Sequence, residues 1–435
     1  MTKDFIGKNI KRVAVIGGGP GGIAAARALY KEKAFDVITV YDRNTQAGGT
    51  WIYDPNTDPP PPIPSIDALE VDFTLQVQKL HSPIYAGLRA NLPKSVMCYR
   101  DVAFDPKVPL FAYHQQVLDY LKTIVVSENL LPLFRFSTRV DRVEPQKDVW
   151  IVSTTDLTLG KQSDQEFDAV VIATGHYNVP YIPNIPGVDQ LSRHTKVMHS
   201  RDYRSPDLFK DKTVLVIGGG SSGLDIVRET SVVAHKVYQC IRTENEMSRQ
   251  AEPRSNVEQV SLLKRFDGST IEFDDGKRVQ DVDVVVFATG FLFSYPFLPF
   301  QKGNLIQKGQ KVHQLSHYMF YKQNPTLSFI GLPIKVAPFP LMQLQATVVA
   351  KYWSNQVPMI PYEELEQERD DKKEIVFSME QECNYSNRLG AWAEGWVDRP
   401  LEEWNSDDAV TGQLSDEWKR LRKEAFSLRK VHLGY

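Results

Sequence analysis

Residues 12–30 read RVAVIGGGPGGIAAARALY, an apolar strand pattern followed by a glycine-rich turn and a segment with helical spacing. Residues 213–230 read TVLVIGGGSSGLDIVRET and repeat the pattern. The glycine triplets have identical spacing and are Gly17, Gly19 and Gly22, then Gly218, Gly220 and Gly223. Runs of Val and Ile suit a strand buried on both faces, and glycines spaced this way let a pyrophosphate approach the start of a helix. Two copies in strand-turn-helix context are far more specific than one, so they predict two dinucleotide-binding βαβ units.

Each unit is followed, much later in the chain, by a second apolar strand that ends in Ala-Thr-Gly, at 167–177 and at 282–291. Proline-rich YNVPYIPNIPG and the segment FLFSYPFLPF suit linkers into and out of the second unit. We therefore predict an α/β fold of two Rossmann-like dinucleotide-binding domains, in which a smaller domain is inserted into a larger one. The expected limits are 1–178 for the first part of the larger domain, 179–291 for the insertion and 292–435 for the completing part.

Composition excludes several classes of protein. The 435 residues carry 51 Lys and Arg against 54 Asp and Glu, so no global positive field exists to hold nucleic acid. The cysteines Cys98, Cys240 and Cys383 lie far apart and never form CxxC, which leaves no residues for a disulfide scaffold, a zinc ribbon or a redox dithiol. We expect no metal site. The amino terminus shows no secretory signal, and no stretch is typical of a transmembrane helix.

The residue that ends the second strand of each unit predicts which nucleotide binds there. Asp42 ends the first such strand and can accept hydrogen bonds from both ribose hydroxyls, which suits FAD or NAD and repels a 2'-phosphate. The corresponding strand of the second unit has no acid, and Arg242 follows it. A guanidinium there can pair with a 2'-phosphate, which favours NADPH, although a solvated arginine at a strand end is the alternative.

A chain with one FAD-type and one NADPH-type site is typical of a flavin-dependent oxidoreductase. The two-cofactor disulfide reductases share this layout, but they need a pair of nearby cysteines beside the flavin, and this chain has none. Dioxygen is then the expected electron acceptor, which favours a monooxygenase or an oxidase.

Five segments together resemble the flavin-containing monooxygenases, closest to the short fungal members described as thiol-specific or dimethylaniline monooxygenases. They lie at 17–22, 48–51, 85–101, 173–187 and 286–297. The resemblance implies that Asn91 is the catalytic residue, beside the flavin C4a atom and the nicotinamide, where its amide can donate to an oxygen and accept from the cofactor.

The resemblance also implies the cofactor-binding residues. For FAD they are Gly17, Gly18, Gly19, Pro20, Gly21, Gly22, Asp42, Gly49, Thr50, Trp51, Ala90, Asn91, Val140 and Gln345. For NADPH they are Gly218, Gly220, Ser221, Ser222, Gly223, Asp225 and Arg242. Val140 would offer backbone groups to the adenine, and Gln345 is expected to begin a helix that faces the flavin pyrimidine ring. An ordinary strand and an ordinary helix cap are the alternatives at these last two positions.

The implied activity is NADPH- and O2-dependent oxygenation of soft nucleophiles, thiols, sulfides or tertiary amines, through a C4a-hydroperoxyflavin. A Baeyer-Villiger or N-hydroxylating monooxygenase stays open as an alternative, although Tyr203 stands where the ketone-oxidising relatives tend to carry Trp. A flavin-bound redox sensor without turnover also stays open. The family's identifying motif is degenerate here, since Arg193 and Thr195 replace its Phe and Gly while His199 and Tyr203 remain.

The expected partners are a small-molecule nucleophile and O2, with no nucleic acid and no integral membrane segment, and a homodimer stays open. We expect a cytoplasmic enzyme, and a peripheral position on the endoplasmic reticulum membrane also stays open.

Overall fold

The computed structural model describes residues 9–193, 195–242, 254–359, 375–397 and 399–433. A large sheet has the order β18-β19-β20-β7-β1-β2-β3. Strands β20, β7, β1, β2 and β3 run parallel, and β18 and β19 are antiparallel additions at one edge. The bounds are β1 Arg12–Ile16, β2 Val37–Tyr41, β3 Phe134–Arg135, β7 Ala169–Ile172, β18 Leu315–Ser316, β19 Phe320–Tyr321 and β20 Leu327–Phe329.

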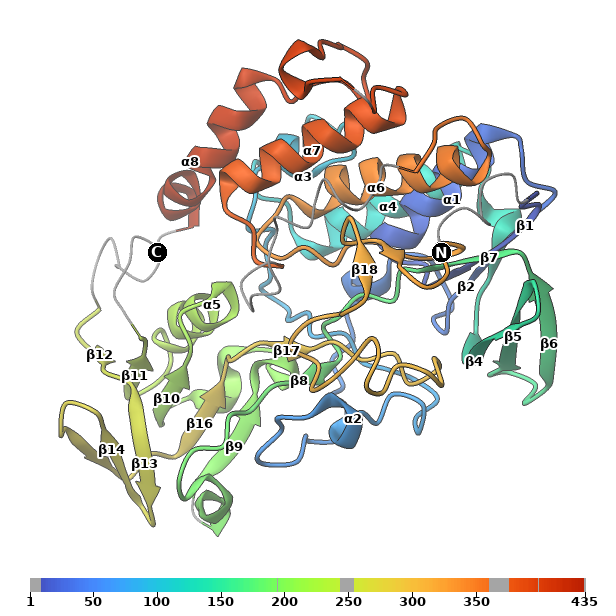
Figure 1. Ribbon diagram of the computed structural model, residues 1–435. Coiled ribbons are helices and arrows are strands. Elements are labelled where there is room, and N and C mark those ends of the chain that lie inside the picture. Colours follow the sequence, from blue (N-terminus) through green and yellow to red (C-terminus); the bar gives the residue numbers. More distant parts are fainter. Residues whose placement is uncertain (1–8, 194, 243–253, 360–374, 398, 434–435) are drawn as a thin grey trace.

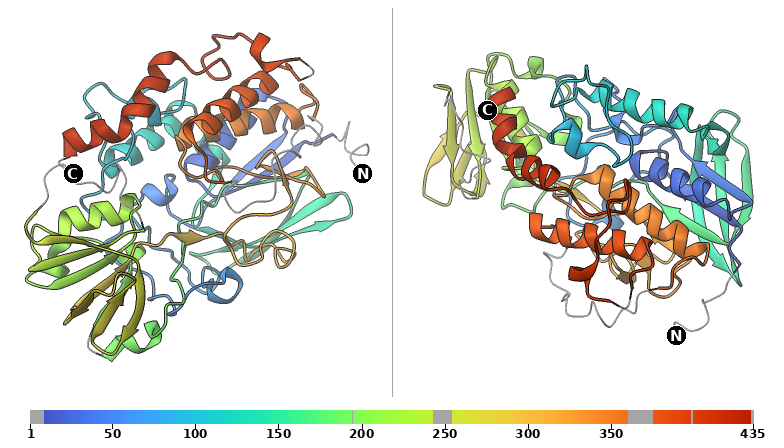
Figure 2. Two further views of the ribbon diagram at one scale, coloured as in Figure 1. Left: turned by 60° about the vertical axis from the view of Figure 1, so that its left-hand side comes forward. Right: turned by 90° about the horizontal axis from the view of Figure 1, so that it is seen from above.

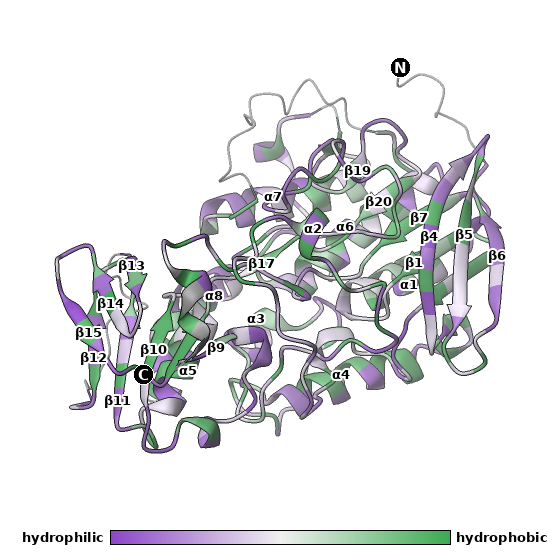
Figure 3. Ribbon diagram, turned by 90° about the horizontal axis from the view of Figure 1, so that it is seen from below, coloured by the Kyte–Doolittle hydropathy of each residue, from purple (hydrophilic) through white to green (hydrophobic). Residues whose placement is uncertain are grey.

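A second sheet is parallel throughout and has the order β12-β11-β10-β16-β9. Its strands are β9 Lys196–His199, β10 Thr213–Ile217, β11 Lys236–Cys240, β12 Val257–Val260 and β16 Val284–Phe287. The core positions of β1, β7, β10 and β16 are almost all buried, as runs of Val and Ile require in parallel sheets. Figure 3 shows β1 and β10 in green, whereas the outer strand β6 is largely purple.

Antiparallel sheets flank the two parallel ones. One consists of β4 Thr138–Gln146, β5 Val149–Asp156 and β6 Gln162–Phe167, and another of β13 Leu263–Asp267, β14 Thr270–Phe273 and β15 Arg278–Gln280. Strand β8 Val179–Pro180 pairs with β17 Phe291–Leu292 where the chain passes between the two parallel sheets (Figure 1). We propose to divide the chain at this ribbon, into a larger domain of 1–178 and 292–435 and an inserted domain of 179–291.

The helices of the larger domain lie over one face of its sheet (Figure 1). They are α1 Pro20–Glu32, α3 Lys94–Met97, α4 His114–Ser127, α6 Pro338–Trp353, α7 Met379–Ala393 and α8 Asp416–Leu433, and the short α2 Ala68–Val71 lies apart from them. Helix α1 packs against α6, and α6 packs against α7. In the inserted domain, α5 Ser221–Thr230 follows β10. The C-terminal half of α8 extends over α5, as Figures 1 and 2 show from different sides.

Within the described residues, no helix is both long and apolar enough to cross a membrane.

Candidate active site

The first glycine turn joins β1 to α1 and leaves no room for side chains at two of its positions. A Cβ on Gly22 would lie 1.7 Å from the Gly17 carbonyl oxygen, and a Cβ on Gly17 would lie 2.5 Å from the Ala173 carbonyl oxygen. Gly17 also has φ +105°, which favours glycine. Helix α1 starts at Pro20, and no side chain caps its N-terminus. Its first backbone N–H groups and the positive end of the helix dipole therefore fit the pyrophosphate of FAD.

Asp42 lies beside this turn at the end of β2. Its carboxylate accepts hydrogen bonds from the backbone N–H of Gly18 at 2.5 Å and of Asn44 at 2.7 Å. Burial raises the pKa of Asp42, and the two amide bonds only partly oppose that rise. The start of β4 adjoins Asp42, because the Thr138 N–H donates to the Asp42 carbonyl at 2.9 Å. Two residues further, Val140 is buried and its backbone belongs to the β4–β5 pair.

The segment 48–51 closes over the same turn. The Gly48 N–H donates to the Gly18 carbonyl at 3.0 Å, and a Cβ on Gly49 would lie 2.7 Å from the Gly19 Cα. The Trp51 ring makes an edge contact with Phe339, with ring centroids 6.2 Å apart. The structure therefore brings the segment of Gly49, Thr50 and Trp51 to the first glycine turn.

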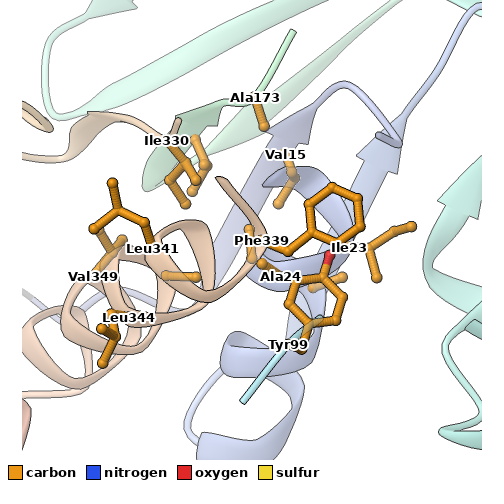
Figure 4. Close-up of a cluster of buried hydrophobic side chains, with 14 of the residues drawn as sticks. Val15, Ile23, Ala24, Tyr99, Ala173, Ile330, Phe339, Leu341, Leu344 and Val349 are labelled. Atoms are coloured by element: carbon orange, nitrogen blue, oxygen red, sulfur yellow. The ribbon is translucent and has the colours of Figure 1, made fainter. Parts of the chain in front are cut away.

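Phe339 is a residue of this region that the sequence did not single out. It lies in the first turn of α6, and its ring is 5.5 Å from that of Tyr99, between α6 and α1 (Figure 4). The Tyr99 hydroxyl donates to the Pro20 carbonyl at 2.5 Å. The signal available in the sequence was Ala-Pro-Phe-Pro at 337–340, since Pro is favoured in the first turn of a helix.

The expectation that Gln345 begins this helix is wrong. The helix begins at Pro338, so Gln345 lies two turns inside it and is fully buried. Its side-chain oxygen accepts from the Gly331 N–H at 2.9 Å, and its side-chain nitrogen donates to the Tyr385 hydroxyl at 3.1 Å. Both ends of the amide are thus engaged within the protein, and Phe339 rather than Gln345 lies at the helix start.

Asn91 is exposed and directly follows the buried Ala90, whose N–H donates to the Ala112 carbonyl at 2.8 Å. Earlier in the chain, the Ser82 hydroxyl donates to the Thr50 carbonyl. The structure thus leaves the Asn91 side chain accessible and connects a preceding stretch of the chain to the segment 48–51.

The second glycine turn, between β10 and α5, has the same construction as the first. A Cβ on Gly223 would lie 2.2 Å from the Gly218 carbonyl oxygen, and one on Gly218 would lie 2.3 Å from the Ala288 carbonyl oxygen. Gly220 is the N-cap of α5, where no side chain caps the helix, and a Cβ there would meet no atom within 4 Å. This open space over an uncapped helix start fits the pyrophosphate of NADPH.

The remaining residues that the resemblance implies for NADPH divide into two groups. Ser221 and Ser222 are the first residues of α5 and are accessible, and Arg242 is exposed just after β11. Asp225, which the resemblance also implies for NADPH, is placed differently. Its carboxylate is buried and is held by Arg429 of α8 and the Tyr85 hydroxyl. Nothing in the local sequence indicates these partners.

His199 and Tyr203 of the degenerate motif are fully buried. The His199 Nδ1 accepts from the Arg201 N–H at 3.1 Å, and burial lowers the pKa of His199 to about 3. The Tyr203 hydroxyl donates to Glu229 of α5 at 2.7 Å. Both side chains therefore lie inside the inserted domain.

The similarity of this chain to known proteins shows which family it belongs to. The sequence matches the family described as flavin-binding monooxygenase-like over residues 69–267 and 254–389. It is 34% identical to flavin-containing monooxygenase FMO GS-OX5 of Arabidopsis thaliana, over 93% of this chain and 89% of that protein. It is 31% identical to the thiol-specific monooxygenase of Saccharomyces cerevisiae, over 80% of this chain and 78% of that protein.

Among solved structures, S-allyl-L-cysteine S-oxygenase from Allium sativum superimposes with a TM-score of 0.80 at 28% identity, covering 97% of this chain and 93% of that chain. The two glycine turns fit the architecture of these similar proteins. The chain belongs to the flavin-containing monooxygenase family.

Proposed function

We propose that this FAD- and NADPH-dependent monooxygenase transfers one oxygen atom of O2 to a soft nucleophile, with the sulfur of a small thiol or thioether as the preferred acceptor and a tertiary amine nitrogen as the other. The observation that carries the proposal is the pair of uncapped glycine turns in one chain, together with the accessible Asn91. The names of relatives from garlic and yeast, an S-oxygenase and a thiol-specific monooxygenase, support sulfur as the acceptor.

The overall reaction balances without a protein nucleophile. NADPH, a proton, O2 and a thioether give NADP+, water and a sulfoxide, so an S–O bond forms, the O–O bond breaks, and the second oxygen leaves as water. When bound, FAD accepts the two electrons of NADPH and supplies the activation of dioxygen. The sulfur lone pair is itself the nucleophile, so no residue of the chain has to remove a proton from a thioether.

The residues of this chain bind the two cofactors and orient the reacting groups. The first turn, with Asp42, holds the FAD pyrophosphate and ribose, and the second turn, with Ser221, Ser222 and Arg242, holds NADPH. The Asn91 amide donates an N–H to the reacting oxygen and accepts from the cofactor.

The free cysteines of the described chain, Cys98, Cys240 and Cys383, support a reducing compartment. Burial raises the pKa of Cys98 and of Cys240 to about 11, which keeps both thiols protonated and poorly reactive. The proposal therefore places the enzyme in the cytoplasm, with any contact with the endoplasmic reticulum membrane peripheral.

The test combines a substrate panel with the Asn91→Leu variant. NADPH consumption and oxygenated product are measured with cysteamine, S-allyl-L-cysteine, dimethylaniline and cyclohexanone. We expect product with the sulfur compounds and, in Asn91→Leu, a loss of product of about 100-fold with FAD still bound, as for the loss of one donor to a reacting oxygen. Ser95→Ala, an exposed change four residues away, serves as the matched control. Product from cyclohexanone alone would replace the proposal with ketone oxidation, and normal product yield in Asn91→Leu would remove the role of Asn91.

A further inference from the structure

A buried ionic contact joins the inserted domain to the larger one at α5, the helix that follows the second glycine turn. The Nη2 atom of Arg429, in α8, lies 3.0 Å and 2.9 Å from the two carboxylate oxygens of Asp225, in α5. The hydroxyl of Tyr85 donates to the same carboxylate. The side chains of Arg429 and Asp225 are only 2% and 5% exposed, and Tyr85 is also buried. The carboxylate of the inserted domain is thus held by two groups of the larger domain.

The buried Asp225 carboxylate needs both Arg429 and Tyr85 as partners. A buried carboxylate is costly unless it is paired and hydrogen-bonded, and here Arg429 supplies the opposite charge. Burial and the Asp225 charge raise the pKa of Tyr85 well above its ordinary value, so its hydroxyl stays protonated and remains a donor. Removal of either partner leaves the Asp225 carboxylate less well satisfied inside the protein.

Tyr85 also begins the segment that carries Asn91, and this segment lies directly on the inserted domain. The Ala86 N–H donates to the Arg204 carbonyl at 2.9 Å. A Cβ on Gly87 would lie 2.4 Å from a carboxylate oxygen of Glu229, one turn after Asp225 in α5. The segment therefore lies close to the Glu229 side chain of α5.

The other end of the segment is fixed to the larger domain. The His114 N–H donates to the Leu88 carbonyl at 3.2 Å, and the Ala90 N–H donates to the Ala112 carbonyl at 2.8 Å, both next to the start of α4. Asn91 follows directly. A short and well-bonded stretch of backbone thus connects the Asp225 contact to Asn91.

We propose that Asp225, Arg429 and Tyr85 act together as positioning residues, which hold the NADPH-binding helix α5 and the Asn91 segment in one fixed arrangement. The inference rests on the proposed function, because it concerns the alignment of Asn91 with a nicotinamide bound over α5. When the contact is broken, misalignment diverts oxygen transfer into the balanced side reaction in which NADPH, a proton and O2 give NADP+ and hydrogen peroxide.

The activity test compares Arg429→Met and Tyr85→Phe with Arg422→Met. Arg422 is a matched control, since it lies on the same helix and pairs with the buried Glu382 at 2.9 Å, inside the larger domain. We expect the ratio of hydrogen peroxide to NADPH consumed to rise about threefold or more in the first two variants, because small misplacements of reacting groups have large effects. The control should match the wild type, and Arg429→Lys should recover part of the coupling.

A second readout does not depend on turnover. Hydrogen exchange of residues 85–91 is measured in the FAD-loaded protein, and NADP+ binding is titrated calorimetrically. In Arg429→Met and Tyr85→Phe we expect faster exchange in this segment and several-fold weaker NADP+ binding. Tyr85→Phe keeps the ring and removes only the hydroxyl, so it carries the test if Arg429→Met does not fold.

The proposal is overturned if both readouts stay at wild-type values in a folded Tyr85→Phe, or if Arg422→Met changes them equally. Failure of the proposed function is a separate outcome, because the wild type would then give no oxygenated product while exchange and NADP+ binding still report on the contact.

Discussion

Gly220→Ala separates the nucleotide-binding role of the second glycine turn from its structural role. Gly220 has φ −80° and ψ 177°, an extended conformation that alanine also adopts, and the added methyl group would meet no protein atom within 4 Å. Because alanine is a poorer N-cap than glycine, we expect a loss of up to about 1 kcal/mol in the free energy of unfolding. Gly223→Ala should cost more, about 1–3 kcal/mol, because its Cβ would lie 2.2 Å from the Gly218 carbonyl oxygen and the backbone would have to shift.

The effect of Gly220→Ala on binding should be much larger than its effect on folding. The methyl group fills the open space over the start of α5 and keeps the pyrophosphate from the backbone N–H groups. A hydrogen bond to a charged group contributes about 1.5–3 kcal/mol, so the loss of one corresponds to about 10- to 150-fold weaker NADPH binding. FAD should stay bound, because its pyrophosphate lies at the other turn.

The assay measures FAD content by absorbance, the Kd of NADP+ by titration and the KM of NADPH. Gly19→Ala is the reciprocal variant, since Gly19 is the N-cap of α1 with φ −79°, and it should lower FAD content instead. A Gly220→Ala protein that keeps its FAD and binds NADP+ within about twofold of the wild type would refute the placement of the pyrophosphate.

Two further predictions concern Arg242 and His199. Arg242→Gln should raise the KM of NADPH about tenfold or more and leave that of NADH unchanged, because a guanidinium at the strand end pairs only with the 2'-phosphate; equal changes for both cofactors would contradict this. Burial lowers the pKa of His199 from 6.5 to about 3, so the unfolded chain takes up a proton as the pH falls below about 6.5 and the folded protein does not. The wild type should therefore lose about 2 kcal/mol of stability between pH 6.5 and 5 relative to His199→Gln, as measured by urea unfolding at each pH, and parallel pH profiles would count against it.

The sequence predicted those parts of the site that depend on short-range patterns. Each glycine turn is a short motif with a distinct spacing, and Asp42, the acid that follows β2, lies 25 residues after Gly17. The buried strands β1 and β10 were recognisable because their runs of Val and Ile are continuous.

No short-range pattern in the sequence indicates which distant segments come into contact. Arg429 lies 204 residues from Asp225, and Tyr85 lies 140 residues from it, so no local pattern could indicate that these two side chains hold the Asp225 carboxylate. Gln345 was misplaced for another reason. The start of α6 is set by Pro338, which can occupy the first helical position, and the sequence analysis placed that start a full two turns too late.

Several contacts set how the inserted domain is oriented on the larger one. The chain enters and leaves the inserted domain through β8 and β17, a ribbon of two residues on each strand. Arg204 of the inserted domain donates to the Asn56 carbonyl, and its own carbonyl accepts from the Ala86 N–H. The contact at Asp225 differs from these because it acts on α5, the helix that follows the second glycine turn. Arg429 approaches α5 from α8 of the larger domain and Tyr85 approaches it from the Asn91 segment, so this contact bears directly on the proposed alignment of the two sites.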